Sequence, residues 1–328
     1  MNKSFSLFLM VLFATACSKD DKNDNPKRLY VTIGQVSSGT TEILTDISFG
    51  NSETAYICGA NGTLLKSADG GNQWSLMATG LYQSLNCIQA LDDQQVFMAR
   101  NDLYSSDNGG QTWLGHGLDN FGSQIAGLQF KDNKTGFILK NGIMKSGDSG
   151  GTWNMVFDAA NDPVNYMIVY RRIEFLNSDL GFCAGGRSFD NSSVGNILKT
   201  SDGGETWTSL GFQTSEVTAF HFLNTATGFA FNFNKELWKT TDGGDNWKKI
   251  SSLIPYSYPD CYFLSEDTII LKTANEIYHS NDGGSSWGKD YTNPDPNVIL
   301  TRMKFFEKYR GYVIGHEGFI AEIKLGNK

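Results

Sequence analysis

Residues 200–207 read Thr-Ser-Asp-Gly-Gly-Glu-Thr-Trp, and this pattern decides the fold because it returns five more times along the chain. Each copy ends at a tryptophan and carries aspartate or asparagine at its third position. The six copies span 67–74, 106–113, 146–153, 200–207, 240–247 and 280–287. From Trp to Trp the spacings are 39, 40, 54, 40 and 40 residues. A period of about 40 residues predicts an array of similar structural units.

The segments ahead of these turns share one plan. In the fifth unit, apolar and aromatic runs at 217–222, 228–233 and 237–240 are separated by short polar turns, and Trp247 opens a fourth run. Four short strands in about 40 residues make one blade of a β-propeller. The composition agrees, because 36 glycines and the lack of a long helical period are typical of an all-β chain.

A seventh unit begins at Leu300 but has no such turn and no fourth run. The missing strand is available at 29–33, ahead of the first unit. We therefore predict a seven-bladed β-propeller over residues 29–328, with four antiparallel strands per blade and the N-terminal strand closing the last blade. Closure of this kind removes exposed sheet edges. The spacing of 54 predicts an insertion of about fourteen residues in the fourth unit.

The residues that recur in the six turns are predicted to be structural. Asp or Asn accepts local backbone N–H groups, Ser or Thr adds a second polar arm, and glycine permits a positive φ. The tryptophan packs against the neighbouring sheet. Because the same residues recur at every turn, we do not expect catalysis or metal binding from them. The set comprises Asp69, Asn108, Asp148, Asp202, Asp242 and Asp282 with Trp74, Trp113, Trp153, Trp207, Trp247 and Trp287.

The first 28 residues predict export and a lipid anchor. Lys3 precedes an apolar run at 5–16 that is too short to cross a bilayer comfortably, and the run ends in Ala-Thr-Ala-Cys17. Small residues before a cysteine resemble the lipobox of bacterial lipoproteins, in which the cysteine is acylated. We assign residues 1–16 to a lipoprotein signal peptide, Cys17 to lipidation, and the charged residues 17–28 to a flexible tether.

The residues after Cys17 also bear on location. Ser-Lys-Asp-Asp at 18–21 resembles the export signal of Bacteroidetes lipoproteins that reach the cell surface. We expect a lipoprotein of the cell envelope, held in the outer membrane and exposed at the surface. The alternative is an ordinary cleaved signal peptide, which would leave a soluble periplasmic or secreted protein.

The net charge, the cysteines and the histidines restrict the functions that this chain could have. A net charge of −8 argues against a nucleic-acid surface, and membrane contact is expected through the anchor alone. The cysteines at 58, 87, 183 and 261 lie far apart and are expected to be free thiols. The four histidines have no ligand spacing, so we expect no metal and no cofactor. A closed propeller of this kind is expected to be a monomer.

The six turns resemble the Asp box, or BNR repeat, that bacterial sialidases and other exported propellers share. The fuller unit has Gly-Phe, a short turn and then Lys-Thr-x-Asp-Gly-Gly-x-x-Trp, as at 199–207 and 239–247. It is most similar to the photosystem II stability and assembly factor family, over residues 29–325. That resemblance implies a seven-bladed, non-enzymatic scaffold. It does not imply photosynthesis, because the lipoprotein N-terminus is foreign to a thylakoid factor.

Candidate binding residues lie where the units differ. The first strand of each blade borders the central channel, and ligands commonly bind at such a mouth. The alternation of a strand places two polar series on its channel side. The candidates are Asp46, Arg172, Glu174, His221, Asp260, Tyr262, Arg302 and Lys304, with Arg171 and Arg187 in the enlarged fourth unit. They either bind a partner or form ion pairs that satisfy one another in a water-filled channel.

The leading hypothesis is a non-catalytic binding or assembly scaffold for a protein or glycan partner. A sialidase needs an Arg-Ile-Pro motif, whereas Arg172-Ile173 is followed here by Glu174. The alternative is a carbohydrate-active enzyme, a glycosidase or lyase, that uses two opposed carboxylates at the channel mouth. Asp46, Glu174 and Asp260 are the candidates, although no motif selects a pair.

Overall fold

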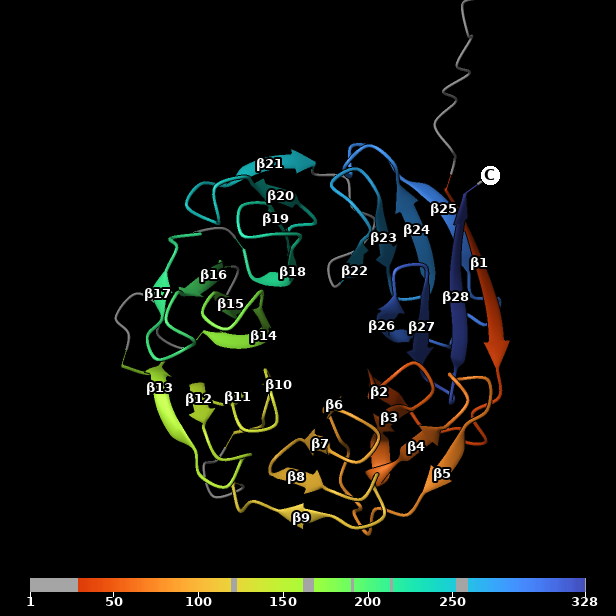
Figure 1. Cartoon of the computed structure of the whole chain (residues 1–328). Coiled ribbons are helices and arrows are strands. Elements are labelled where there is room, and N and C mark those ends of the chain that lie inside the picture. The colour runs from red at the N-terminus through yellow and green to blue at the C-terminus, as the bar shows by residue number, and fades with distance from the viewer. Residues whose placement is uncertain are drawn as a thin grey trace, which may run out of the picture.

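The computed structural model describes residues 29–118, 123–161, 168–189, 192–212, 215–251 and 259–327. Cys17 and the rest of the first 28 residues lie outside this range, so the predicted anchor and tether stay predictions. In the described residues, 28 strands form seven four-stranded antiparallel sheets. Figure 1 shows these sheets as blades around a common axis, which confirms the predicted propeller.

The first three blades follow one another in chain order. Blade 1 consists of β2 (Leu44–Phe49), β3 (Ala55–Gly59), β4 (Leu64–Ser67) and β5 (Ser75–Met77). Blade 2 consists of β6 (Cys87–Ala90), β7 (Val96–Ala99), β8 (Leu103–Ser106) and β9 (Leu114–Gly115). Blade 3 consists of β10 (Gly127–Phe130), β11 (Gly136–Leu139), β12 (Gly142–Ser146) and β13 (Asn154–Asp158).

The next three blades repeat this order. Blade 4 consists of β14 (Val169–Phe175), β15 (Gly181–Phe189), β16 (Ser192–Thr200) and β17 (Thr208–Ser209). Blade 5 consists of β18 (Val217–Phe222), β19 (Gly228–Asn232), β20 (Leu237–Thr240) and β21 (Lys248–Ser251). Blade 6 consists of β22 (Asp260–Phe263), β23 (Ile269–Lys272), β24 (Glu276–Ser280) and β25 (Gly288–Thr292).

Blade 7 joins the two ends of the chain. Its strands are β26 (Leu300–Glu307), β27 (Arg310–Gly315), β28 (Ile320–Asn327) and β1 (Leu29–Val36). The β1 strand runs antiparallel to β28, from Leu29 opposite Asn327 to Val36 opposite Ile320. Figure 1 shows the red β1 beside the dark blue β28. The predicted closure is confirmed, and the closing strand is longer than predicted because its pairing continues past Ile33.

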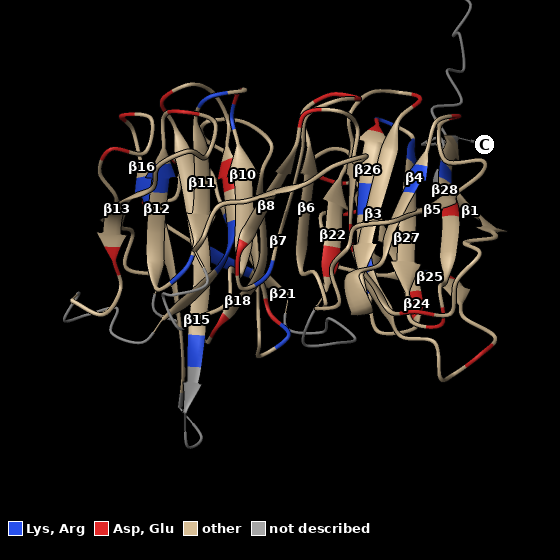
Figure 2. Ribbon diagram, turned by 90° about the horizontal axis from the view of Figure 1, so that it is seen from below, with Lys and Arg blue, Asp and Glu red and all other residues tan. Residues whose placement is uncertain are grey.

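The disk has two faces, fixed by the strand order. We call box face the side that carries the six Trp-ending turns, the box turns, together with the turns between the first and second strands of each blade. The opposite side, the linker face, carries the connections between blades. The insertion of blade 4 is divided between the connection that precedes β14 and the β15–β16 hairpin. Figure 2 shows β15 extending beyond the other strands on the linker face.

Each box turn is closed by the same hydrogen bonds. In blade 4, the Thr200 hydroxyl donates to Asp202 Oδ1 (2.7 Å) and accepts the Gly204 N–H (2.9 Å). Asp202 Oδ1 also accepts the Thr206 N–H at 3.0 Å. Gly203 and Gly204 have φ of +73° and +82°, a region that side chains other than glycine rarely adopt.

Adjacent blades are joined at these turns. Lys66, Lys145 and Lys199 each donate to the carbonyl of a glycine in the box turn of the next blade, at 3.0 Å. Blade 7 has no box turn of its own but holds that of blade 1, because the Tyr312 hydroxyl donates to the Gly70 carbonyl at 2.8 Å. Blades 7 and 1 are therefore joined by a hydrogen bond to a glycine carbonyl, as at the three lysine contacts, but the donor is a tyrosine and not a lysine.

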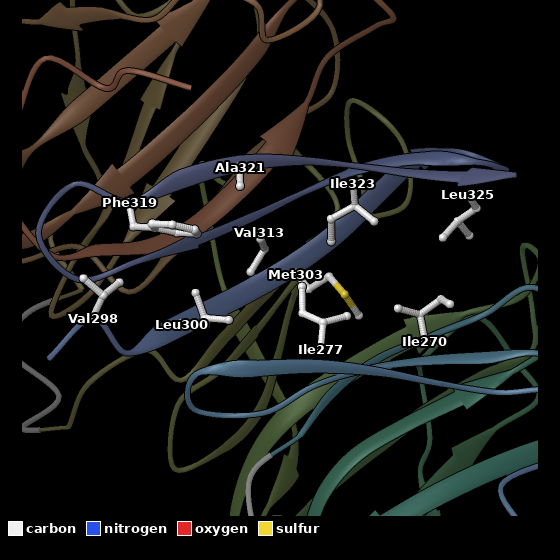
Figure 3. Packing of buried hydrophobic residues seen from close by; sticks show 10 residues of the cluster. All are labelled: Ile270, Ile277, Val298, Leu300, Met303, Val313, Phe319, Ala321, Ile323 and Leu325. Carbon is white, nitrogen blue, oxygen red and sulfur yellow. The ribbon is translucent and has the colours of Figure 1, made fainter. Parts of the chain in front are cut away.

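Apolar side chains fill the space between blades. Between blades 6 and 7, Ile270 and Ile277 face Met303, Val313 and Ile323, as Figure 3 shows. Similar clusters lie between the other blades. Burial of this surface is the main stabilising contribution to such a fold.

The described ranges contain four free cysteines, of which Cys261 is half-buried and the others are buried. No His, Cys, Asp or Glu group among the described residues is arranged to hold a metal ion. Nor does any helix in these ranges have the length and apolar character needed to cross a membrane.

Candidate functional site

A cavity of about 710 Å³ occupies the channel at the box face. Its wall is formed by the first strands of the blades, and its rim includes Asn51, Ser52 and Glu307. Of the predicted residues, the structure brings together those that line this cavity: Asp46, Arg171, Arg172, Glu174, His221, Asp260, Arg302 and Lys304. The alternation of the first strands thus places most of the predicted polar residues in one space.

Arg302 connects three neighbouring blades. It lies on β26 of blade 7, and its Nε is 2.9 Å from Asp46 Oδ1 on β2 of blade 1. Its Nη1 is 3.8 Å from Asp260 Oδ2 on β22 of blade 6. Each carboxylate also accepts a backbone N–H of the next blade, Ile88 for Asp46 and Met303 for Asp260. These contacts hold the first strands of adjacent blades in register.

Asp260 is the centre of this network. Arg172 of blade 4 reaches it across the channel, with Nη2 3.6 Å from Oδ1. Burial raises the pKa of Asp260 to about 6, although Lys272 and the Met303 N–H favour its charged form. Lys272 lies opposite Asp260 on β23, and its ammonium donates to the carbonyls of Leu300 and Thr301. The carboxylate is therefore charged at neutral pH and protonated in mild acid.

A second pair lies on blades 4 and 5. His221 Nδ1 is 2.9 Å from Glu174 Oε1, and the imidazole stacks on Phe263 with ring centroids 5.6 Å apart. The side chains of His221 and Glu174 are 36% and 23% exposed, so this pair faces the channel water. It satisfies both groups and leaves them accessible to a ligand.

Lys304 differs from the paired channel charges described above. Its side chain is exposed within the channel, and in the described residues its ammonium has neither a hydrogen bond nor an ion pair. Desolvation by the surrounding protein lowers the pKa of Lys304, whereas Asp46 and Asp260 favour its charged form. A cation that no side chain neutralises is available to an anionic or polar group of a ligand.

Gln129 presents a second unsatisfied group. Its counterpart on blade 2, Gln89, accepts the Phe130 N–H at 2.6 Å and donates to the Phe130 carbonyl at 2.9 Å. Gln129 Oε1 is buried in the cavity wall and has no partner among the described residues. Because buried polar atoms are normally hydrogen-bonded, this oxygen is a site where a ligand donor would be stabilised.

Three predicted residues lie elsewhere or at the margin. Tyr262 is outside the cavity lining, because its ring stacks on Phe305 (4.0 Å between centroids) between blades 6 and 7. Arg187 lies on the extended part of β15 opposite Val194, away from the channel mouth. Arg171 lines the inner end of the cavity, and its Nε is 3.1 Å from Glu216 Oε1.

Sequence reasoning did not select every residue of the wall. Asn51 and Ser52 lie in the turn after β2, and Glu307 is the last residue of β26. Each follows an aromatic residue of the first strand, Phe49 or Phe305, by two or three positions, and this proximity was the available signal. Lys272 carried no signal, because only the pairing of β22 with β23 places it opposite Asp260.

The charges of the cavity balance. Arg171, Arg172, Arg302 and Lys304 face the carboxylates of Asp46, Glu174, Asp260 and Glu307. The chain as a whole carries −8, so the channel mouth is less acidic than the rest of the molecule. Fixed charges of both signs with unsatisfied polar atoms suit the binding of a polar ligand better than that of an apolar one.

These observations define the class of protein: a seven-bladed β-propeller with a polar cavity at one mouth of its channel. Two solved structures of YCF48, the photosystem II assembly factor, have the same fold. YCF48 bound to D1 peptide is 19% identical and has a TM-score of 0.69, with 89% of this chain and 96% of that chain covered. YCF48 from Cyanidioschyzon merolae is 17% identical, with a TM-score of 0.70 and coverage of 89% and 98%.

More distant propellers also match. The GH74 xyloglucanase from Xanthomonas campestris is 12% identical with a TM-score of 0.61, over 82% of this chain and 51% of the enzyme. The WD40 propeller of Doa1 is 9% identical with a TM-score of 0.66. At these identities the similarity establishes the fold alone. No protein-family model matches the sequence, and no curated protein matches it.

Proposed function

We propose that this chain is a non-catalytic lipoprotein of the cell envelope that binds a protein or glycan partner at the channel mouth. In this proposal Cys17 carries the lipid, and the propeller is held at the outer membrane and exposed at the cell surface. The single observation that carries the binding role is the cavity of about 710 Å³ that contains an unneutralised lysine, Lys304, in a balanced set of charges.

Two further observations support a binding role. One of the similar structures is YCF48 bound to D1 peptide, so a propeller of this architecture can hold a polypeptide. The Asp46, Arg302 and Asp260 network is fixed by backbone hydrogen bonds, so a ligand would meet a preorganised wall. A scaffold for assembling an envelope complex uses the same surface and is included in the proposal.

The test is a search for ligands with matched variants. Wild-type protein, Lys304→Ala and Lys134→Ala are screened against a glycan array and a library of synthetic peptides. Lys134 is exposed in a turn outside the cavity, so its change controls for the loss of one charge. We expect Lys304→Ala alone to weaken binding at least about tenfold, which corresponds to one charge-assisted hydrogen bond. Equal binding by all three proteins would contradict the proposal.

The rival function is that of a carbohydrate-active enzyme. One observation favours it: Asp260, with a pKa of about 6, shares the cavity with the carboxylates of Asp46 and Glu174. A general acid beside a carboxylate is the arrangement that glycoside hydrolysis requires. Against it, both Asp46 and Asp260 accept backbone N–H groups and contact Arg302, which is a structural use of these carboxylates.

Release of reducing sugar from plant and host polysaccharides tests this rival. We expect no release by the wild type. Release that is abolished by Asp260→Asn or Asp46→Asn, and retained by the box-turn variant Asp202→Asn, would establish the enzyme instead.

A further inference from the structure

The strand β1 differs from the outer strands of the other blades. Those strands have 3, 2, 5, 2, 4 and 5 residues, whereas β1 has eight. The longer of them carry charged residues, such as Asp158 in β13, Lys248 in β21 and Lys289 in β25. The β1 sequence, LYVTIGQV, has no charge and no proline. Charge, proline and shortness are the usual protections of a sheet edge, and β1 has none of them.

The outer edge of β1 is open in the described structure. The strand order of blade 7 is β1-β28-β27-β26, so in the described residues β1 pairs with β28 alone. Figure 1 shows β1 at the outer rim of the disk. The residues Thr32, Gly34 and Gln35 are exposed, whereas the side chains of Val31 and Ile33 pack against the cluster between blades 6 and 7.

The chemistry of this edge selects its occupant. A row of alternating N–H and C=O groups is matched by another extended polypeptide, and not by a sugar or a lipid chain. A second copy of the same strand is complementary by symmetry, because a two-fold axis perpendicular to the sheet keeps each face on its own side. Centred on Thr32, this register sets Val31 of one copy opposite Ile33 of the other. In this pairing no charged residues of the two β1 strands lie opposite each other.

We propose that the chain forms a two-fold symmetric dimer through antiparallel pairing of the β1 strands, which joins the two seventh blades into one eight-stranded sheet. This surface is distinct from the channel mouth and leaves both cavities open. The closed ring alone predicts a monomer, whereas this proposal predicts a dimer. The dimer does not depend on the proposed ligand.

Gly34 provides a clean variant for the test. A Cβ placed on Gly34 meets no heavy atom within 4 Å, and Gly34 lies opposite Glu322 on β28. The variant Gly34→Lys therefore has room in the monomer, opposite a carboxylate that already contacts Arg310 and Lys324, while it places charge on the open edge. Gly147 also has nothing within 4 Å and lies on the box face, so Gly147→Lys is the matched control.

The experiment is sedimentation velocity on the exported chain with Cys17→Ser, which removes the thiol that would be acylated. Samples span about 1 to 500 µM at 150 mM salt. We expect reversible dimerisation of the parent and of Gly147→Lys, and a dissociation constant at least about tenfold higher for Gly34→Lys. Circular dichroism melting confirms that Gly34→Lys is folded.

Either of two results would overturn the dimer: a parent that stays monomeric over the whole range, or a Gly34→Lys variant that associates equally well. If the monomeric parent binds a synthetic peptide of residues 29–36, the edge accepts a strand from a different protein instead. Lys304→Ala is expected to dimerise normally, so failure of the ligand proposal and failure of the dimer are distinguishable.

Discussion

Asp260 shows how a single residue can serve both the ring and the site. Its carboxylate accepts the Met303 N–H at 2.9 Å and lies between Arg302 and Arg172, so it links blade 7 to blade 4 across the channel. Burial favours its neutral form, and the cations favour its charged form. Loss of the proton therefore strengthens the contact with Arg172, and uptake of a proton releases that guanidinium toward a ligand.

The first prediction is that Asp260 titrates near pH 6. In carbon NMR, one carboxyl resonance should have a midpoint of about 6 and should be absent from Asp260→Asn. The folded pKa exceeds the ordinary value of 3.8, so the folded state holds this proton more tightly than the unfolded chain. The contribution of Asp260 to stability therefore declines as the pH rises from about 4 to about 6. A carboxyl midpoint below 4.5 would contradict this description of the site.

The second prediction concerns the box carboxylates, whose pKa shifts have the opposite sign. Hydrogen bonds from Thr206 lower the pKa of Asp202, and similar bonds lower the pKa of Asp69, Asp148 and Asp242. Their contribution to stability is present above the unfolded pKa of about 4 and is lost as the pH falls through the lower folded values. Asp202→Asn should keep the turn, because Asn108 makes the same bonds in blade 2.

The melting temperature of Asp202→Asn, measured between pH 2 and 7, checks this. We expect it to change less steeply below pH 4 than the melting temperature of the wild type. Parallel curves for the two proteins would show that the box carboxylate is not the group that titrates.

At the scale of the element, the box turn fixes where one blade meets the next. Gly204 has φ of +82°, and a Cβ there would lie 2.4 Å from the Phe137 ring of blade 3. The Trp207 ring packs edge-on against Phe137 and Phe175 at the same joint. The glycine is therefore required by both its backbone angle and its neighbours.

The third prediction is that Gly204→Ala lowers the free energy of unfolding by about 2–4 kcal/mol, through strain and overpacking together. Gly147→Ala is the control, since nothing lies within 4 Å of its Cβ and its φ is not positive. Urea denaturation of the two variants measures the difference. Equal free energies of unfolding would show that the contact between blades 3 and 4 accommodates the added methyl group without loss of stability.

The elements divide into those that the sequence predicts and those that it does not. The strands of blade 5 follow the predicted runs closely, because box turns and aromatic residues mark their ends. The nine-residue strands β15 and β16 were not predicted, since a longer hairpin and a longer linker give the same Trp spacing. Local patterns define a repeated unit well, but not how an insertion divides within it.

The residues of the candidate site also divide into those that the sequence predicts and those that it does not. The alternation of the first strands predicted that Asp46 and Arg302 would share the channel, although they are 256 positions apart. It also placed Tyr262 there, whereas stacking on Phe305 takes that ring into the space between blades. Which charges meet across the ring, such as Arg172 and Asp260, depends on three-dimensional distances that no repeat encodes.

At the scale of the whole molecule, the ring depends on one strand from the far end of the chain. The β1 strand covers β28, and Tyr312 and Arg310 bind the Gly70 carbonyl of blade 1. These contacts let blade 7 close the ring without a box turn. The closure also leaves β1 as the one long, uncharged outer strand in the described structure, which is the basis of the proposed dimer.

The fourth prediction is that deletion of residues 29–36 opens the ring. Ile323 and Leu325 of β28 would lose their cover, and β28 would become an exposed edge. We expect high-order aggregates in size-exclusion chromatography, with partial rescue by a synthetic peptide of residues 29–36. A monodisperse deletion variant would show that six complete blades hold the seventh without its closing strand.

The central claim is that function lies in the channel charges, where the blades differ, and not in the box turns, where they agree. The most direct measurement compares wild type, Lys304→Ala and Asp202→Asn on one glycan and peptide array. We predict that the wild-type signals fall at least about tenfold in Lys304→Ala and are retained in Asp202→Asn. Loss of binding in Asp202→Asn with full binding by Lys304→Ala would contradict it.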